Sequence, residues 1–238
     1  MKRKDELNYP HQTDSDFFGF TSDWHIGNKH TNEDYILDYL DLLKERGVKQ
    51  IFHGGDLFEG YRIYKSQINE LLPDCFGMNE QIKHFNKLIP KQKDLNIKLI
   101  SGNHLVKNHK GKNVVEELCY IRKDIDYLGK YECLVGLKDG VTMEIIHPSR
   151  KSRYGRLSEV NNYLNLLPEK PNILGIGHKH ISNCHLYNDV VCYHLGTFLS
   201  EPNKKNNKFS PDIGAWIVEL DIDGGEIISN KSDWISYE

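Results

Sequence analysis

Five short clusters of Asp, Asn and His residues each follow an apolar run of strand length, and no other feature constrains the fold as much. In chain order they are Asp23-Trp24-His25, Gly54-Gly55-Asp56, Gly102-Asn103-His104, His147 and Gly177-His178-Lys179-His180. Short apolar runs that end in polar residues or glycine are typical of buried strands. Because the carboxyl ends of parallel strands meet at one edge of a sheet, a single fold can bring all five clusters together.

Segments typical of strands and helices alternate along most of the chain. We expect strands at 17–23, 49–53, 97–100, 131–137, 141–146 and 172–176, and helices at 33–46, 61–93, 113–122 and 157–167. Pro73 and Gly77 interrupt the longest of these helices. The segments 184–198 and 213–229 are typical of β-hairpins. This order predicts an α/β fold, in which helices cover a mixed sheet system and the active site lies at the carboxyl ends of strands.

The length of the chain, 238 residues, suits one well-buried domain. We expect an N-terminal extension over residues 1–16 and a single domain over residues 17–238. No apolar run has the length of a signal-peptide core or of a membrane helix, which needs about 18 apolar residues. The sequence therefore predicts a soluble, cytoplasmic protein that has no membrane partner.

Cysteine usage and net charge exclude several classes of protein. The five cysteines are scattered and form no C-x-x-C pair, so we expect reduced structural cysteines rather than disulfides or a zinc ribbon. The formal net charge of −3 indicates no general affinity for nucleic acid, so any attraction for a phosphate backbone must come from local basic loops. Ala215 is the only alanine, while Asn, Lys and Ile are abundant, which indicates an AT-rich genome such as that of a phage or a low-GC bacterium.

Taken singly, most of the clusters also have a structural explanation. A D-x-H triplet is common by chance, Asp56 could cap a turn, and a lone histidine such as His147 is more often a satisfied core or surface residue. His178 and His180 are a stronger signal, because two histidines at alternate positions can turn both rings toward one metal ion. Since all the clusters follow strand-like runs, we interpret them jointly as one metal site at the edge of the sheet system.

The order D-x-H, G-D, G-N-H, lone His and G-H-x-H resembles the five signature motifs of the calcineurin-like metallophosphoesterase superfamily, over residues 17 to about 220. The stretches TSDWHIG and GGDLFEG are further similar to the DNA-repair nuclease branch, which includes the nuclease subunit of the bacterial SbcCD complex. The G-D-x-V-D-R-G run of Ser/Thr protein phosphatases is absent from the sequence. The resemblance therefore implies a phosphodiesterase or nuclease rather than a protein phosphatase.

The resemblance implies a four-layer α/β/β/α sandwich of two mixed β-sheets flanked by helices. It also implies two metal ions that share Asp56, one held by Asp23, His25, Asp56 and His180, the other by Asp56, Asn103, His147 and His178. His104 would be the general acid beside the leaving oxygen. Members of the nuclease branch usually have an acidic residue after G-N-H, which orients this imidazole. Here Leu105 stands in that place, so the sequence does not show what orients His104.

Two divalent ions about 3.5–4 Å apart can share a hydroxide nucleophile and neutralise charge on a phosphoryl group. Ligation by carboxylate, amide and imidazole without thiolates favours Mn²⁺ first, with Fe, Zn or Ni as alternatives. We therefore expect a dinuclear metal-dependent phosphoesterase that hydrolyses phosphodiester bonds.

Basic side chains near the motifs bear on the substrate. Arg150, Lys151 and Arg153 follow His147 and suit contact with a phosphate backbone, although a solvated loop would have the same composition. The loops 107–112 and 204–208 add further lysines. We expect a nuclease acting on DNA or RNA. The alternatives are a small-molecule phosphodiesterase or nucleotidase and, third, a non-catalytic binding protein, and the sequence does not indicate an oligomeric state.

Overall fold

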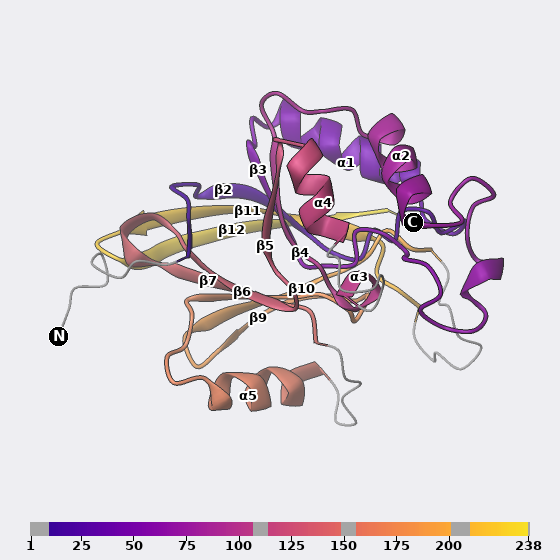
Figure 1. Ribbon diagram of the computed structural model, residues 1–238. Helices are drawn as coiled ribbons and strands as arrows, with labels where there is room; N and C mark the ends of the chain where they lie inside the picture. Colours follow the sequence, from indigo (N-terminus) through magenta and orange to yellow (C-terminus); the bar gives the residue numbers. More distant parts are fainter. Residues whose placement is uncertain (1–9, 107–113, 149–155, 201–209, 238) are drawn as a thin grey trace.

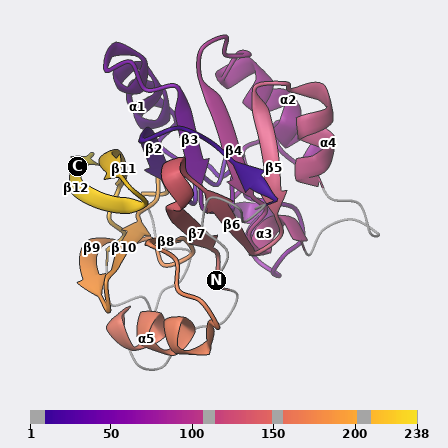
Figure 2. The same ribbon diagram turned by 90° about the vertical axis from the view of Figure 1, so that its left-hand side faces the viewer.

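The computed structural model of the chain describes residues 10–106, 114–148, 156–200 and 210–237. Within them the chain forms two six-stranded mixed sheets that lie face to face between helices, as Figures 1 and 2 show. The first sheet has the order β12-β11-β2-β3-β4-β5, and the second has the order β1-β6-β7-β8-β10-β9. The predicted four-layer sandwich of two mixed sheets flanked by helices is therefore confirmed.

The strands of each sheet have the following bounds. Those of the first sheet are β2 (Phe17–Thr21), β3 (Gln50–His53), β4 (Asn96–Ile100), β5 (Ile125–Gly129), β11 (Gly214–Asp223) and β12 (Glu226–Ser236). Those of the second sheet are β1 (His11–Gln12), β6 (Glu132–Gly136), β7 (Thr142–Ile146), β8 (Ile173–Ile176), β9 (Ser182–Tyr187) and β10 (Val190–Leu195). β2 to β5 run parallel to one another, and β7, β8 and β10 also run parallel.

The longer helices, α1 (Glu33–Glu45), α2 (Met78–Leu88), α4 (Val114–Ile121) and α5 (Arg156–Leu166), lie on the outer faces of the two sheets (Figure 1). The single turn α3 (Asn103–Val106) follows the end of β4. α1, α2 and α4 cover the first sheet, while α5 covers the second. None of the helices in the described ranges is long and apolar enough to cross a membrane.

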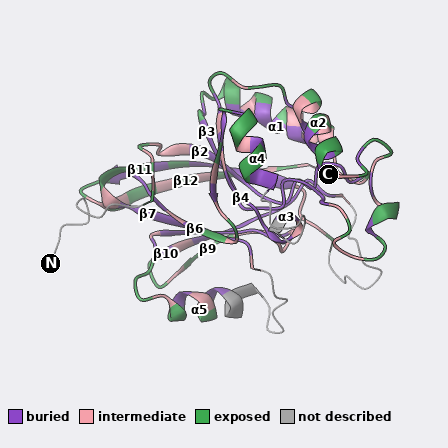
Figure 3. Ribbon diagram, viewed as in Figure 1, coloured by how far each residue is buried: buried purple, intermediate pink, exposed green. Residues whose placement is uncertain are grey.

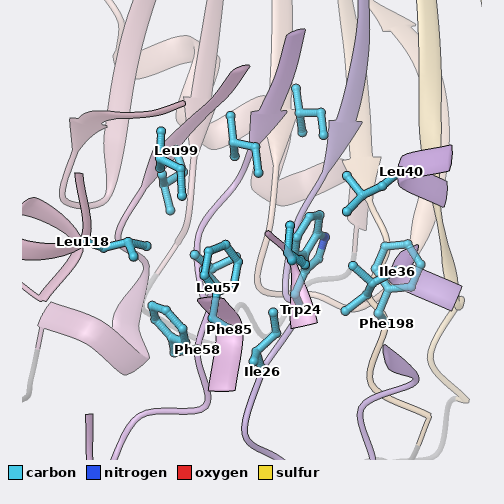
Figure 4. Packing of buried hydrophobic residues seen from close by; sticks show 14 of the residues in the cluster. Trp24, Ile26, Ile36, Leu40, Leu57, Phe58, Phe85, Leu99, Leu118 and Phe198 are labelled. Carbon is cyan, nitrogen blue, oxygen red and sulfur yellow. The ribbon is translucent and has the colours of Figure 1, made fainter. Parts of the chain in front are cut away.

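Three hydrophobic clusters fill the three spaces between the four layers. The largest lies between the first sheet and its helices and includes Trp24, Leu57 and Phe198, which Figure 4 shows at close range. The second lies between the two sheets, and the third lies under α5. Figure 3 shows the same layering, since the strands are mostly buried while exposed residues lie on the outer sides of the helices.

β2 shows how the sequence alternates between two of these layers. Phe18 and Phe20 belong to the cluster between the sheets, whereas Gly19, between them, faces α1. A Cβ atom at Gly19 would lie 2.6 Å from the hydroxyl oxygen of Tyr39, so only glycine lets α1 pack this closely. The Tyr39 hydroxyl then donates a hydrogen bond to the Trp216 carbonyl at 2.7 Å, which ties α1 to β11.

Most elements agree with the sequence expectation to within a few residues, but the helix predicted over residues 61–93 is wrong. Only α2 and a 3₁₀ turn at Gln67–Asn69 are helical in that stretch. Gly77 has φ +143°, which L side chains rarely adopt, and it precedes the first residue of α2. Residues 61–77 instead form a loop held by the side chains of Gln67 and Gln81. β5 was not predicted at all, and the short β1 lies within the predicted N-terminal extension.

Candidate metal centre

The carboxyl ends of five strands deliver the predicted site residues to one edge of the sandwich. β2 ends at Thr21 before Asp23, β3 at His53 before Asp56, and β4 at Ile100 before Asn103. β7 and β8 end directly before the segments that carry His147, His178 and His180. The structure brings these residues together in two clusters of ligand-type atoms.

The first cluster consists of Asp23, His25 and His180. One Asp23 carboxylate oxygen, Oδ1, lies 3.2 Å from His180 Nε2 and 3.6 Å from His25 Nε2. The other oxygen, Oδ2, accepts hydrogen bonds from the Ser22 hydroxyl at 2.5 Å and from the His178 amide at 2.8 Å. The carboxylate is thus fixed on one side and presents its other oxygen to two imidazoles, as a metal ligand would.

The second cluster consists of Asp56, His147 and His178, with Asn103 beside it. His147 Nε2 lies 3.0 Å from Asp56 Oδ2 and 3.2 Å from Asn103 Oδ1. His147 Nδ1 donates to the Gly54 carbonyl at 2.6 Å, which assigns the proton to Nδ1 and turns Nε2 toward the cluster. His147 Nε2 also lies 4.0 Å from Asp23 Oδ1, so the two clusters adjoin.

His104 lies next to the first cluster, and its ring centroid is 4.7 Å from that of His25. The His104 amide donates to Asp56 Oδ1 at 2.8 Å. Its Nδ1 lies 2.5 Å from the backbone carbonyl of Glu59, which accepts its hydrogen bond. The group that orients the imidazole is therefore Glu59, while Leu105 is fully buried in the hydrophobic cluster under α1 and α2.

Glu59 is the site residue that the sequence prediction missed. Its side chain is fully buried, and Oε2 accepts a hydrogen bond from His25 Nδ1 at 2.8 Å. Oε1 accepts from the Gln67 amide at 2.9 Å and from the Tyr64 hydroxyl at 3.0 Å. One residue thus positions His25 through its carboxylate, His104 through its carbonyl, and the loop 61–70 through both groups. The only local signal was its place three residues after Asp56.

Backbone strain is concentrated in the same place. Asp23, His25, Asp56, His178 and His180 all have φ between 50° and 72°, the left-handed region that non-glycine residues rarely adopt. Each such residue costs about 1–3 kcal/mol and persists only where the surrounding structure enforces it, which is typical of functional sites. For Asp23, His25 and Asp56, the core supplies that enforcement, because the adjacent residues Trp24 and Leu57 are fully buried (Figure 4).

Close packing around Asp56 also requires a glycine at position 102. A Cβ atom at Gly102 would lie 2.3 Å from Asp56 Oδ1 and 2.5 Å from the Asp56 amide nitrogen, and φ is +78°. Both the space and the backbone conformation therefore exclude every other residue type. This explains physically why a glycine precedes Asn103 after β4.

Three buried atoms in the clusters have no hydrogen-bond partner, namely Asp23 Oδ1, His25 Nε2 and Asp56 Oδ2. A buried carboxylate oxygen or ring nitrogen left in this state costs free energy unless a cation neutralises or coordinates it. The unpaired atoms belong to predicted ligands of both ions, and carboxylate oxygen with imidazole nitrogen suits divalent cations. The residues therefore fit bound divalent metal ions.

The histidines in the clusters differ in the direction of their pKa shifts. Burial lowers the pKa of His25, but the nearby Asp23 carboxylate and the hydrogen bond to Glu59 outweigh burial and raise the pKa to about 10. Burial also opposes the charge on His147, whereas the Asp56 and Asp23 carboxylates raise its pKa to about 9. Burial lowers the pKa of His178 to about 3, so this imidazole stays neutral. Protons on two of the imidazoles thus neutralise the buried carboxylates when no cation does.

The predicted backbone-binding residues Arg150, Lys151 and Arg153 lie outside the described residues, as do the loops 107–112 and 204–208.

His53, which was assigned no role, is fully buried, and its Nδ1 accepts a hydrogen bond from the Gly55 amide at 3.2 Å. Burial lowers its pKa to about 3, so it is a neutral structural histidine beneath the site.

Comparison with known proteins supports the fold. No family model and no curated protein matches the chain. Among solved structures, an archaeal phosphodiesterase is similar with a TM-score of 0.52 and 16% identity, over 92% of this chain and 99% of the other. Vps29 from Entamoeba histolytica, in complex with Zn²⁺, is similar with a TM-score of 0.51 and 12% identity, over 92% and 98%. At such identities the likeness shows a shared fold.

The opposing pKa shifts predict that the metal-free protein is most stable near pH 6.5. His25 and His147 bind protons more tightly when folded, so their contribution is complete below about pH 6.5 and is lost as the pH rises through about 9 and 10. His53 and His178 resist protonation when folded, so stability also falls as the pH drops from about 6.5 toward about 3. Thermal unfolding in the presence of chelator, from about pH 3 to pH 10, measures this stability. A midpoint temperature that does not change with pH would contradict the prediction.

Replacing Glu59 by Gln should weaken metal binding by about 10–100-fold, because the negative partner of the His25 ring is lost. Isothermal titration of the metal-free protein with Mn²⁺ measures the affinity. The matched control is Glu70→Gln, since Glu70 also accepts from the Tyr64 hydroxyl but is not hydrogen-bonded to His25. Equal affinities for the wild type and Glu59→Gln would show that Glu59 supports only the loop.

Proposed function

We propose that this chain is a metal-dependent phosphodiesterase of the calcineurin-like metallophosphoesterase superfamily and that it acts on nucleic acid. The observation that carries the proposal is the convergence of seven ligand-type side chains and His104 at one edge of the sandwich. The fold shared with an archaeal phosphodiesterase and with a Zn²⁺ complex of Vps29 supports it.

The two clusters suggest how the ions are divided. One ion would be held by Asp23, His25 and His180, the other by Asn103, His147 and His178, with Asp56 shared between them. When bound, such ions supply an activated water as nucleophile and neutralise charge on the phosphoryl group. Carboxylate, amide and imidazole ligands favour Mn²⁺, with Fe, Zn or Ni as alternatives.

His104 would protonate the leaving oxygen. Its Nδ1 is bound to the Glu59 carbonyl, so Nε2 is the nitrogen that would carry the proton. The side chain keeps 12% of its surface exposed, whereas those of Asp23 and Asp56 have 0% and 1%. A substrate approaching from solvent would therefore meet this imidazole at the rim of the site, above the buried carboxylates.

The loop 61–68 favours a polymer over a small ester. Arg62, Ile63, Tyr64, Lys65 and Ile68 line an open hollow of about 380 Å³. The ring of Tyr64 lies 6.1 Å from that of His104, which places the hollow beside the predicted general acid. Exposed basic side chains interleaved with aromatic rings suit a single strand, whose phosphates and bases they can bind. Arg150, Lys151 and Arg153 would extend this surface.

Two other functions are less well supported. A small-molecule phosphodiesterase or nucleotidase would bind its substrate in a closed pocket, whereas the hollow beside Tyr64 is open. The other alternative is a non-catalytic binding protein with the same fold. Yet such a protein would not need every predicted ligand and the strained backbone that positions them.

The activity is tested with two chromogenic esters after the chain is loaded with Mn²⁺. We expect turnover of bis-p-nitrophenyl phosphate to exceed that of p-nitrophenyl phosphate, and we expect cleavage of an oligonucleotide. Chelator should abolish all activity, and Asp56→Ala should lose more activity than any other ligand variant, because a shared carboxylate is removed. Absence of diester hydrolysis with any divalent ion would refute the proposal.

Replacing His104 by Ala should lower the rate on an oligonucleotide by about 10²–10⁴-fold, because its leaving alkoxide needs a proton. The loss on bis-p-nitrophenyl phosphate should be smaller, since p-nitrophenolate leaves without one. Metal content, measured by elemental analysis, should not change. Equal losses on both substrates, or loss of metal, would make His104 a ligand or a structural residue.

Replacing Arg62 and Lys65 by Ser should raise KM for single-stranded DNA and flatten its dependence on salt, by about 0.7 per lost contact on a log–log plot. Hydrolysis of bis-p-nitrophenyl phosphate should stay the same. The control is Lys138→Ser with Lys170→Ser, because both lysines are exposed and lie before β7 and β8, at the edge opposite the site. An unchanged salt dependence would exclude this loop from the polymer interface.

A further inference from the structure

A second group of metal-ligating side chains lies among the helices, and it shares no residue with the candidate metal centre. Asp74 and Cys75 belong to the loop before α2, and His84 is on α2. Glu33, in the first turn of α1, completes the group, since its Oε1 lies 2.6 Å from His84 Nε2. α1, α2 and the loop before α2 each contribute side chains to this group.

Asp74, Cys75 and His84 lie close enough together to share one metal ion. Asp74 Oδ2 lies 3.4 Å from His84 Nδ1, and Asp74 Oδ1 lies 3.8 Å from Cys75 Sγ. Ligands that surround Zn²⁺ at about 2.0–2.3 Å in a tetrahedron stand about 3.3–3.8 Å from one another. A carboxylate oxygen of Asp74, the thiol of Cys75 and a ring nitrogen of His84 lie within 4.8 Å of one another.

Glu33 gives His84 the arrangement of a zinc-bound histidine. Its carboxylate accepts a hydrogen bond from Nε2, which leaves Nδ1 as the ring nitrogen that faces Asp74. A metal-bound imidazole usually donates its other N–H to a carboxylate in this way. The tautomer that a metal ion requires is therefore already selected by α1.

The surroundings of Cys75 favour a cation. The residue is fully buried, and its thiol donates a hydrogen bond to the Asp74 carboxylate. Burial, together with the carboxylates of Asp74, Glu33 and Glu80, raises the pKa of the thiol to about 12. The surrounding carboxylates would attract a cation, and a bound metal ion would displace the thiol proton. The Asp74 side chain is 70% exposed, which leaves an open side for a water ligand and for entry of the ion.

We propose that Asp74, Cys75 and His84 bind a divalent cation of the zinc type, with Glu33 as the carboxylate that orients His84. Thiolate, imidazole and carboxylate together select Zn²⁺ over Mg²⁺ or Mn²⁺. With three protein ligands and an exposed fourth position, this cation would be separate from the ions at the strand ends.

The cation would tie the loop that carries His25 to the outer helices. The Leu72 amide donates to the Gly27 carbonyl at 2.9 Å, and a Cβ atom at Gly27 would lie 3.4 Å from Cys75 Cβ. Gly27 follows His25 by two residues. A cation at Cys75 would thus hold the loop 71–77 against this segment as well as against α1 and α2.

The test is titration of the reduced, metal-free full-length chain with Co²⁺. Cobalt bound to a thiolate gives a near-ultraviolet charge-transfer band, and the predicted ligands of the other centre include no cysteine. We expect a band whose intensity at saturation corresponds to one cobalt–thiolate bond per chain. The band should disappear when Zn²⁺ displaces Co²⁺. Cys75→Ser should abolish it, and Glu33→Gln should raise the Co²⁺ concentration needed by about 10–100-fold.

Two cysteine variants serve as controls, because Cys192 is buried elsewhere and Cys184 is exposed. Cys192→Ser and Cys184→Ser should keep the band. If Cys75→Ser does not fold, Asp74→Asn, which changes an exposed side chain, should still weaken cobalt binding. No band in the wild type, or a band that Cys184→Ser removes and Cys75→Ser keeps, would overturn the proposal. The group would then be only a set of polar contacts between His84 and the Glu33 and Asp74 carboxylates.

Discussion

Mutual neutralisation of buried carboxylates and imidazoles is the constraint on which the rest of the structure depends. Asp23 and Asp56 are almost fully buried, and burial of an uncompensated carboxylate costs several kcal/mol. The fold meets this cost by surrounding each carboxylate with imidazoles and backbone amides, as in the bonds from the His178 and His104 amides. The same surroundings suit divalent cations, so the arrangement that lets the domain fold is also the one that would hold its metals.

The sheets supply the rigidity that this arrangement needs. Asp23, His25 and Asp56 hold left-handed backbone conformations that cost free energy in L residues and persist only where the surroundings enforce them. Here Trp24 and Leu57 are packed in the core on one side of each loop, and parallel strands fix the other side. The hydrophobic core therefore acts on the site directly, by holding a strained backbone in place.

The sequence indicated which side chains gather at the strand ends, but it assigned one of the surrounding elements wrongly. Motifs at strand ends located Asp23, His25, Asp56, Asn103, His147, His178 and His180, and the structure brings them together. The helix expected over residues 61–93 failed because apolar spacing was given more weight than Gly77 and Pro73, and tertiary contacts decide the conformation of residues 61–77. The ligand assignments and the role of His104 follow from the resemblance and remain predictions.

What the sequence determined by itself was which residue types end which strands, and hence the chemistry available at the sheet edge. Which atoms meet there was decided by the tertiary structure alone. His25 and Glu59 are 34 residues apart, and His178 and Asp23 are 155 residues apart, yet each pair is joined by one hydrogen bond. Glu59 resembled any surface glutamate in the sequence, and Leu105 removed the expected partner of His104. Only the folding of separate segments against one another creates the burial that gives these hydrogen bonds their strength.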